Sequence, residues 1–427
     1  MKVLVVAEYY PRANDPVLGI WAHRQAIAAR DAGAELRVLV LHRPAASLAA
    51  VRAGNYRAFG QALRQPARAE LDGLRVAYLR YLSPPRPWSY DSWGAWAAPA
   101  LRLALRRLRR SFPFDLIHAH YAVPAGDAVR RAAPQIPLIV SVHGHDVHGS
   151  GPRSTAVRRT LAHSVLVLAN STGTARRCAG QGARATRVVH LGADLPSPAS
   201  PTPETPGAPT LTIETPGTTG TLETRTQTSE TPGTTGTLRT PVGPGIPTLV
   251  SVGHLVARKR HADVLRALAL LRERHPDLRY VIVGDGPERQ RLGALAASLG
   301  VADMLELRGQ LPHAAAVAAA RSASLFVLPS VEEAFGVAYI EAMAGEVPAI
   351  GCRGEDGPEE IAAAGGGIAL VAPRDPHGLA RRIDALLADP GALAQMGREA
   401  RITVQRRFAW EHCGRQTVQA YRDVLSH

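Results

Sequence analysis

The stretch Pro329–Ala344, PSVEEAFGVAYIEAMA, decides the fold of this 427-residue chain. The short apolar run Phe326–Leu328 comes directly before it and ends at a proline and a polar turn. Beyond the turn, Val337, Ile340 and Ala344 recur with the spacing of one helix face. The stretch therefore predicts a buried strand, a turn and a helix.

Two glutamates stand on either side of the start of this predicted helix. Glu333 lies in the turn, and Glu341 follows about two helical turns later, which at about 1.5 Å per residue separates them by roughly 12 Å. That is too wide for the acid and base of a glycoside hydrolase, which need roughly 5–9.5 Å. The two carboxylates could instead hold the two ends of one elongated ligand.

The first residues of the helix, Phe335, Gly336 and Val337, suit a phosphate between the two glutamates. Free N–H groups and the positive end of the helix dipole favour an anion there, and Gly336 lets the backbone come close. An amphipathic helix with two solvated glutamates is the alternative that this stretch alone leaves open.

The same stretch resembles the signature of glycosyltransferase family 4, whose members are retaining, sugar-nucleotide-dependent enzymes. The matching pattern is E-x-F-G-x-x-x-x-E from Glu333 to Glu341, followed by AMA and Pro348. The resemblance implies the GT-B fold, in which two Rossmann-like α/β domains face each other across a cleft. It also implies that Glu333 contacts the donor hexose, that the helix start holds the diphosphate, and that Glu341 binds the ribose hydroxyls. The chain departs from the family at Glu346, where glycine is usual.

Length and composition favour a two-domain cytoplasmic protein. A chain of 427 residues exceeds one ordinary core. The net charge of +14 comes almost entirely from arginine, since Lys2 and Lys259 are the lysines, and it favours anionic partners. Three widely spaced cysteines form neither a disulfide framework nor a C-x-x-C metal motif, which suits a reducing cytosol. The first apolar run is too short for a signal sequence, and no apolar stretch reaches membrane-spanning length.

Residues 1–195 are predicted to form the first, acceptor-binding Rossmann-like domain. A buried strand over residues 3–7, a loop and a helix that Gly19 precedes open it as a β-α-β unit. The N–H groups near Gly19 could meet an anion, and the resemblance places this loop at the diphosphate and the acceptor. The turn HGHD, beginning at His143, also matches the family, and the match implies that His143 lies beside the donor sugar. A metal site formed by His143, His145 and His148 is an alternative, although the family needs no metal.

The remaining chain is predicted to hold a linker, a second domain and a returning helix. Residues 196–247 are rich in threonine, proline and glycine with few apolar side chains, which predicts a disordered linker insert. Residues 248–407 repeat the β-α order and should form the Rossmann-like donor domain. The resemblance implies that residues 408–427 form a helix that crosses back to the first domain.

A basic loop follows the first strand of this second domain. Lys259 matches the family's lysine, which implies that its charge pairs with the diphosphate. His254 and Arg258 stand near it and are candidates for a share of that contact. Arg308 ends a strand that, by the same resemblance, borders the nucleobase. A basic surface turn without a ligand is the alternative.

The resemblance implies transfer of a hexosyl group from a UDP-, GDP- or ADP-sugar to a glycan or lipid-linked acceptor, with Glu333, His143 and Lys259 as catalytic residues. No metal or further cofactor is expected, and no general base is assigned. The first residues resemble enzymes of cell-surface polysaccharide assembly, such as those of teichuronic acid biosynthesis.

Two other functions remain open from the sequence. One is another GT-B chemistry, such as epimerisation of a UDP-sugar. The other is a non-catalytic basic protein that binds an anionic membrane or nucleic acid, although we do not expect nucleic acid as a partner. The predicted helix over residues 101–110 motivates it, because leucines line one side and arginines the other. Peripheral docking at the inner face of the membrane would also suit a lipid-linked acceptor.

Overall fold

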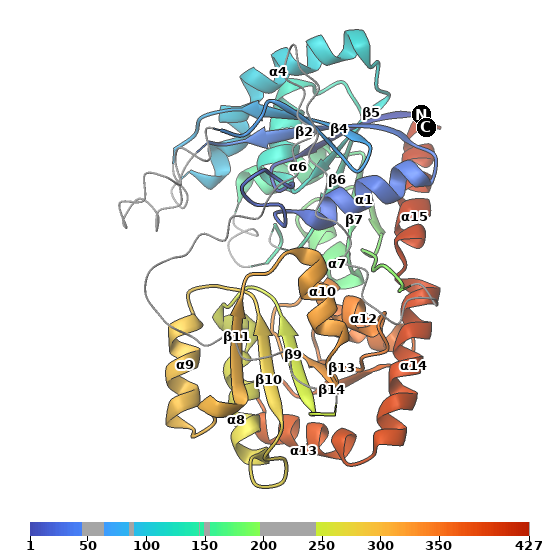
Figure 1. The fold of residues 1–427 in the computed structure, drawn as a ribbon. Helices are drawn as coiled ribbons and strands as arrows, with labels where there is room; N and C mark the ends of the chain where they lie inside the picture. Colours follow the sequence, from blue (N-terminus) through green and yellow to red (C-terminus); the bar gives the residue numbers. More distant parts are fainter. Residues whose placement is uncertain (45–63, 85–88, 145, 149–153, 197–244, 427) are drawn as a thin grey trace.

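The computed structural model describes residues 1–44, 64–84, 89–144, 146–148, 154–196 and 245–426. Two α/β domains lie one above the other, and the final helices run along one side of both (Figure 1). Each domain is built on its own sheet. The prediction of two Rossmann-like domains is confirmed.

The first sheet has eight strands in the order β3-β4-β2-β1-β5-β6-β7-β8, and only the β3–β4 pair among them is antiparallel. Its central strands are buried on both faces, which is why most of their residues are apolar. The strands are β1 Lys2–Ala7, β2 Glu35–His42, β3 Arg68–Leu71, β4 Leu74–Arg80, β5 Leu116–His120, β6 Leu138–Val142, β7 Leu166–Ala169 and β8 Thr186–Val188. The α-helices are α1 Ile20–Asp31, α4 Trp93–Ser111, α5 Asp127–Ala132, α6 Thr155–His163 and α7 Thr172–Gly180.

The second sheet has six parallel strands in the order β11-β10-β9-β12-β13-β14. Its strands are β9 Thr248–Val252, β10 Arg279–Val283, β11 Leu305–Gly309, β12 Leu325–Val327, β13 Ala349–Cys352 and β14 Ile368–Val371. Its α-helices are α8 His261–Leu271, α9 Arg289–Ser298, α10 His313–Arg321, α11 Val337–Met343, α12 Asp356–Ala364, α13 Pro376–Leu387 and α14 Pro390–Arg407, and α15 Trp410–Leu425 ends the described chain.

Each sheet has one point where the strand order reverses. In the first sheet the parallel strands run outward in chain order in both directions from the β1–β5 pair, and in the second sheet from the β9–β12 pair. In open α/β sheets, ligands bind beyond the carboxyl ends of the strands at this switch point. The loops that follow β1, β5, β9 and β12 are therefore the places where the fold positions a site.

Helix α15 belongs spatially to the first domain, although it follows the second in sequence. It packs against α1 (Figure 1), and the Tyr421 hydroxyl lies 2.7 Å from Nδ1 of His118 on β5. The crossing is held where Ala193 donates its N–H to the carbonyl of Phe408 at 2.8 Å. The domain boundaries at 195, 247 and 407 stay predictions, and nearly all of the linker insert, residues 197–244, lies outside the described residues.

The basic helix begins earlier than its leucine pattern indicates. Helix α4 starts at Trp93 and buries Leu101 and Leu105 against the first sheet. Its arginines point to the surface, and those at positions 102, 106 and 109 help to line a hollow of about 500 Å³. Within the described ranges, every helix is too short or too polar to cross a lipid bilayer. Membrane docking through α4 stays a prediction.

Candidate functional site

Two loops at the switch point of the second sheet are bonded to each other. The loop after β9 carries Arg258 and Lys259, and the loop after β12 carries Glu333. The N–H of Val331 donates to the carbonyl of Arg258 at 2.8 Å, which joins the two loops. The first loop is also bonded to the loop after β10, because Leu255 donates its N–H to the carbonyl of Asp285 at 3.0 Å. This backbone scaffold brings a lysine and a glutamate from distant parts of the sequence together.

Lys259 and Glu333 form a largely buried ion pair. Nζ of Lys259 lies 2.5 Å from Oε2 of Glu333, and the two side chains are 12% and 9% exposed. The Ser330 hydroxyl donates to the same carboxylate oxygen at 2.8 Å. Burial alone would raise the pKa of the Glu333 carboxyl, but Lys259, with Arg258 and Ser330, holds this pKa below its ordinary value. Glu333 is therefore an ionised acceptor at neutral pH, able to receive hydrogen bonds from hydroxyl groups.

The turn that carries Glu333 is held by a second carboxylate. The N–H of Glu333 donates to Oε2 of Glu355 at 2.8 Å. Burial raises the pKa of the Glu355 carboxyl, and the neighbouring charge of Glu333 adds to the rise. Glu355 thus fixes the backbone from which the Glu333 side chain extends.

Helix α11 begins directly after Gly336, as the sequence predicts. Gly336 has a φ of +84°, and a Cβ there would lie 2.5 Å from the ring of Tyr339. Glycine is therefore required by both conformation and space. Phe335 is buried and stacks on the ring of His190 with centroids 5.4 Å apart. The first N–H groups of α11 have no acceptor within the helix, as at any helix start.

Glu341 lies on α11 and is paired with a histidine that the sequence did not reveal. Its Oε1 atom is 2.7 Å from Nε2 of His313, the first residue of α10. Burial lowers the pKa of His313, but the bond to Glu341 and its charge outweigh that effect, so the pKa is raised overall. His313 contacts only the Oε1 atom of Glu341 and not its Oε2 atom.

The first domain contributes His143, which follows β6. Its Nε2 lies 3.0 Å from Nδ1 of His120 at the end of β5, and the two rings are nearly parallel with centroids 5.3 Å apart. Trp21 and Tyr121 flank it, with ring centroids at 6.1 and 5.0 Å. Nδ1 of His143 is buried and has no hydrogen-bond partner among the described residues. Burial lowers the pKa of His143 to about 3, so the ring is neutral.

The His143 turn meets the Glu333 turn directly. Gly144 has a φ of +96°, and a Cβ at this position would lie 2.4 Å from Cβ of Ala334. No side chain fits between the two backbones at this point. The structure thus brings His143, Glu333 and Lys259 to one place at the junction of the two domains.

A second set of contacts holds the domains together beside this junction. The Glu360 carboxylate on α12 accepts from the N–H of Thr172 at 2.5 Å and lies 2.8 Å from Nε2 of His190, both in the first domain. Burial raises the pKa of Glu360, but the hydrogen bonds to these two partners lower it by a larger amount, so the pKa lies below its ordinary value. The relative position of the domains is therefore fixed by charge-assisted hydrogen bonds as well as by packing.

The other predicted residues lie on separate loops and strands of the two domains. Gly19 caps α1 with a φ of +63°, and a Cβ there would lie 2.1 Å from the carbonyl of Tyr9, so glycine is required at the β1 loop. The side chains of His254 and Arg258 are exposed on the β9 loop. Arg308 is paired with Glu306 at 2.8 Å on β11, which lies two strands from β9.

A metal site is not apparent in the described part of the chain. No group of three or more histidine, cysteine or carboxylate side chains there could hold a metal ion. His145, one of the three histidines of the alternative metal reading, lies outside the described residues.

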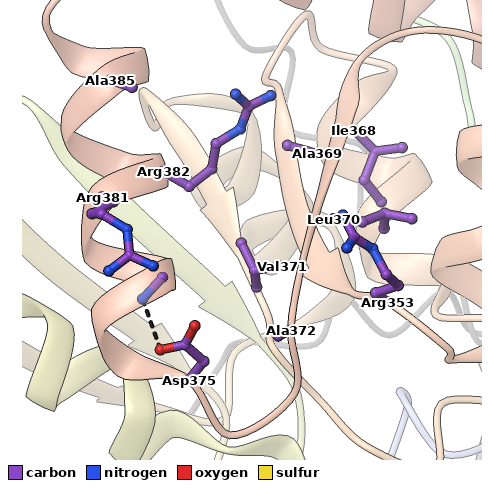
Figure 2. A pocket seen from close by; sticks show the side chains of 11 residues that line it. Arg353, Ile368, Ala369, Leu370, Val371, Ala372, Asp375, Arg381, Arg382 and Ala385 are labelled. Carbon is purple, nitrogen blue, oxygen red and sulfur yellow. Dashed lines mark hydrogen bonds between the residues drawn. The ribbon is translucent and has the colours of Figure 1, made fainter.

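A separate hollow of about 670 Å³ lies at the edge of the second sheet, between β14 and α13 (Figure 2). Arg353, Arg381 and Arg382 line it together with Asp375. None of the predicted site residues lines this hollow. We therefore place the candidate site at the two switch points and not at this edge.

Family models match both domains of the chain. Residues 18–196 match the model described as Glycosyltransferase Family 4, and residues 241–403 match the model described as Glycosyl transferases group 1. The Lys259 loop and the Glu333 turn fall within the second match, and the His143 turn falls within the first.

Three relatives show how far the similarity extends. A 2-deoxystreptamine glucosyltransferase of Streptomyces kanamyceticus is 27% identical over 78% of this chain and 83% of its own length. An exopolysaccharide phosphotransferase of Streptomyces coelicolor is 35% identical over 42% of this chain, but the match spans 19% of that protein. A GDP-mannose-dependent mannosyltransferase of Mycolicibacterium smegmatis is 31% identical over 39% of this chain and 46% of its own length. The chain thus spans less than half of two of these three relatives.

Two solved structures share the fold along the whole chain. Sucrose-phosphate synthase from Thermosynechococcus elongatus has a TM-score of 0.71 at 19% identity and covers 100% of this chain and 99% of its own. Anabaena HepE in complex with UDP and glucose has a TM-score of 0.67 at 18% identity and covers 99% of this chain and 100% of its own. At these identities the likeness concerns the fold. The two family models account for both domains, and the chain belongs to glycosyltransferase family 4, whose members are transferases with the GT-B fold.

Proposed function

We propose that this chain is a retaining glycosyltransferase that moves a hexosyl group from a nucleotide-diphosphate sugar to a glycan or lipid-linked acceptor. The observation that carries the proposal is the buried pair of Lys259 and Glu333 at the second switch point, which the His143 turn of the first domain abuts. A cation beside an ionised carboxylate suits a ligand with a diphosphate at one end and sugar hydroxyls at the other.

The residues have different tasks in this mechanism. Lys259 and the first N–H groups of α11 stabilise the negative charge that builds on the departing diphosphate. Glu333 accepts hydrogen bonds from the hexose, and the buried Nδ1 of His143 is available to another of its hydroxyls. Glu341 binds the ribose. The acceptor hydroxyl attacks on the face from which the diphosphate leaves, and the leaving phosphate takes its proton, so the anomeric configuration is kept.

The donor and acceptor are proposed at the level of chemical class. Similar proteins include one solved with UDP and glucose and one described as GDP-mannose-dependent, which supports UDP- and GDP-sugars as donors. An ADP-sugar is a candidate from the family resemblance alone. Cell-surface polysaccharide assembly is the proposed setting, because a relative is described as an exopolysaccharide enzyme.

A donor screen tests the proposal. We expect one of UDP-glucose, GDP-mannose and ADP-glucose to raise the melting temperature by several degrees, because a ligand at about 100 times its Kd contributes roughly 2.7 kcal/mol. Lys259→Met should abolish most of this shift. The absence of any shift would contradict the proposal, and reversible isomerisation of the donor without transfer would favour an epimerase.

The contact between Gly144 and Ala334 gives a second test. Gly144→Ala should lower transfer by at least about tenfold, because the added Cβ separates the two turns and small displacements of reacting groups are costly. Transfer is measured with the donor that the screen identifies. The double variant Gly144→Ala with Ala334→Gly removes the opposing Cβ and should recover the part of the loss that the clash causes, while the strain of alanine at a φ of +96° remains. Transfer at the original rate in Gly144→Ala would show that the turns need not touch.

A further inference from the structure

His313 lies outside the sequence motifs that mark the donor site, yet its side chain contacts Glu341, one of the carboxylates of that site. It is the first residue of α10, and its Nε2 lies 2.7 Å from Oε1 of Glu341. The two side chains are 33% and 16% exposed, so the bond is partly shielded from water. A short bond between a histidine and a carboxylate in such a place restricts the rotation of both side chains.

The other end of α10 holds the backbone of the same glutamate. Nε of Arg321 donates to the carbonyl of Glu341 at 3.1 Å, and the same guanidinium donates to the carbonyl of Asp194 in the segment that ends the first domain. The side chain of Asp194 is in turn paired with Arg24 on α1. Helix α10 therefore fixes Glu341 through both its side chain and its main chain, and ties it to the first domain.

We propose that His313 is a positioning residue that holds the Glu341 carboxylate ready to accept hydrogen bonds from the ribose hydroxyls of the donor. This inference rests on the proposed function of the site. Anchoring Oε1 leaves Oε2 to receive the hydroxyls. Binding then avoids the cost of ordering a flexible glutamate side chain.

The charge of His313 adds a pH dependence. The groups that act on it are Glu341 on α11, Asp194 after β8 and Arg24 on α1; the carboxylates favour the protonated ring and the arginine opposes it. Burial lowers the pKa of His313, and Glu341 more than offsets this, so the pKa lies above its ordinary value. Below that pKa the protonated His313 ring donates a charge-assisted hydrogen bond to Glu341. The positive charge of the ring then balances the negative charge that the Glu341 carboxylate presents to the anionic nucleotide. Nucleotide affinity should therefore fall as pH rises through the pKa of His313.

The test compares each nucleotide with its own ribose-deficient analogue. Binding of UDP, GDP and ADP is measured by calorimetry, and the one that binds is compared with its 2′,3′-dideoxy form in the wild type and in His313→Ala, His313→Gln and Glu341→Ala. A hydrogen bond to a charged group corresponds to roughly 10- to 150-fold in affinity, so the wild type should prefer the ribose form by about tenfold or more. Glu341→Ala should remove this preference, and His313→Ala should reduce it several-fold.

His313→Gln is the matched control, because its amide can donate a hydrogen bond but does not titrate. It should keep most of the ribose preference and lose the fall in affinity as pH rises above the ordinary histidine pKa of about 6.5. A full ribose preference in His313→Ala, when Glu341→Ala has lost it, would overturn the inference and leave the proposed function standing. An equal loss for both forms of the nucleotide would also overturn it, since it would indicate a general structural role. If no nucleotide binds the wild type, the proposed function fails and the inference fails with it.

Discussion

Glu333→Gln is expected to lower the rate of sugar transfer by about 10²–10³-fold at saturating donor. The substitution keeps the shape of the side chain but removes the charge that Lys259 and Ser330 now contact. Losing one preorganised group that acts on developing charge typically costs this much. Glu332→Gln is the matched control, because its exposed side chain lies one residue away on the same turn. It should retain transfer within about twofold.

The same variant separates loss of activity from loss of fold. Removing one partner of a buried ion pair leaves the other charge uncompensated, which costs up to about 3–5 kcal/mol in fully buried sites. Glu333→Gln should therefore melt earlier than the wild type. The double variant Glu333→Gln with Lys259→Met leaves no unpaired charge and should regain stability while transfer stays low. Full transfer in Glu333→Gln would overturn the assignment of this residue.

Acid should unfold this protein well before its carboxylates titrate. His118, His120 and His143 lie in a row across β5 and β6, and burial lowers the pKa of His118 and of His143 to about 3 and depresses that of His120 as well. In the unfolded chain each would titrate near its ordinary value of about 6.5. Below that pH the unfolded state binds more protons than the native state, so stability is lost as pH falls towards the native pKa values.

The expected loss is large because three rings share the same environment. Each contributes at most about 1.4 kcal/mol per pH unit, so together they cost about 4 kcal/mol per unit below pH 6.5. Urea unfolding between pH 7.5 and pH 5 would measure the slope. His118→Gln, which does not titrate, should reduce that slope by up to about 1.4 kcal/mol per pH unit. A flat stability profile over this range would show that these rings take up protons in the folded protein.

The sequence located most strands because both sheets are covered on both faces. Apolar runs such as Val3–Ala7 and Phe326–Leu328 therefore correspond closely to β1 and β12. Helix α4 was harder, because Pro99 interrupts the helical pattern and disfavours a helix before it. Packing of Trp93 and Ala97 into the core continues the helix through that proline. Tertiary contacts here override the local preference.

The site could be predicted from the sequence only where its residues match the spacing of a known family motif. The motif from Glu333 to Glu341 and the Lys259 loop could be recognised, but the sequence did not predict that Lys259 and Glu333 pair with each other. His120 and His313 act through contacts between residues that lie far apart in the chain. Ser330 contacts Glu333 only three residues away, but a serine is unremarkable in a turn. Glu346, where the family usually has glycine, has a left-handed φ of 63°.

The return of α15 to the first domain constrains the order in which the protein can be made. Cys413, Val418 and Tyr421 lie in the same core as the strand residues Val3 and Val5. During synthesis, the core of the first domain therefore stays incomplete until these residues of α15 leave the ribosome. The strands of the second domain, which run from Thr248 to Val371, emerge before that point. The first domain is thus translated before the second, but its core is completed only after the strands of the second domain have emerged.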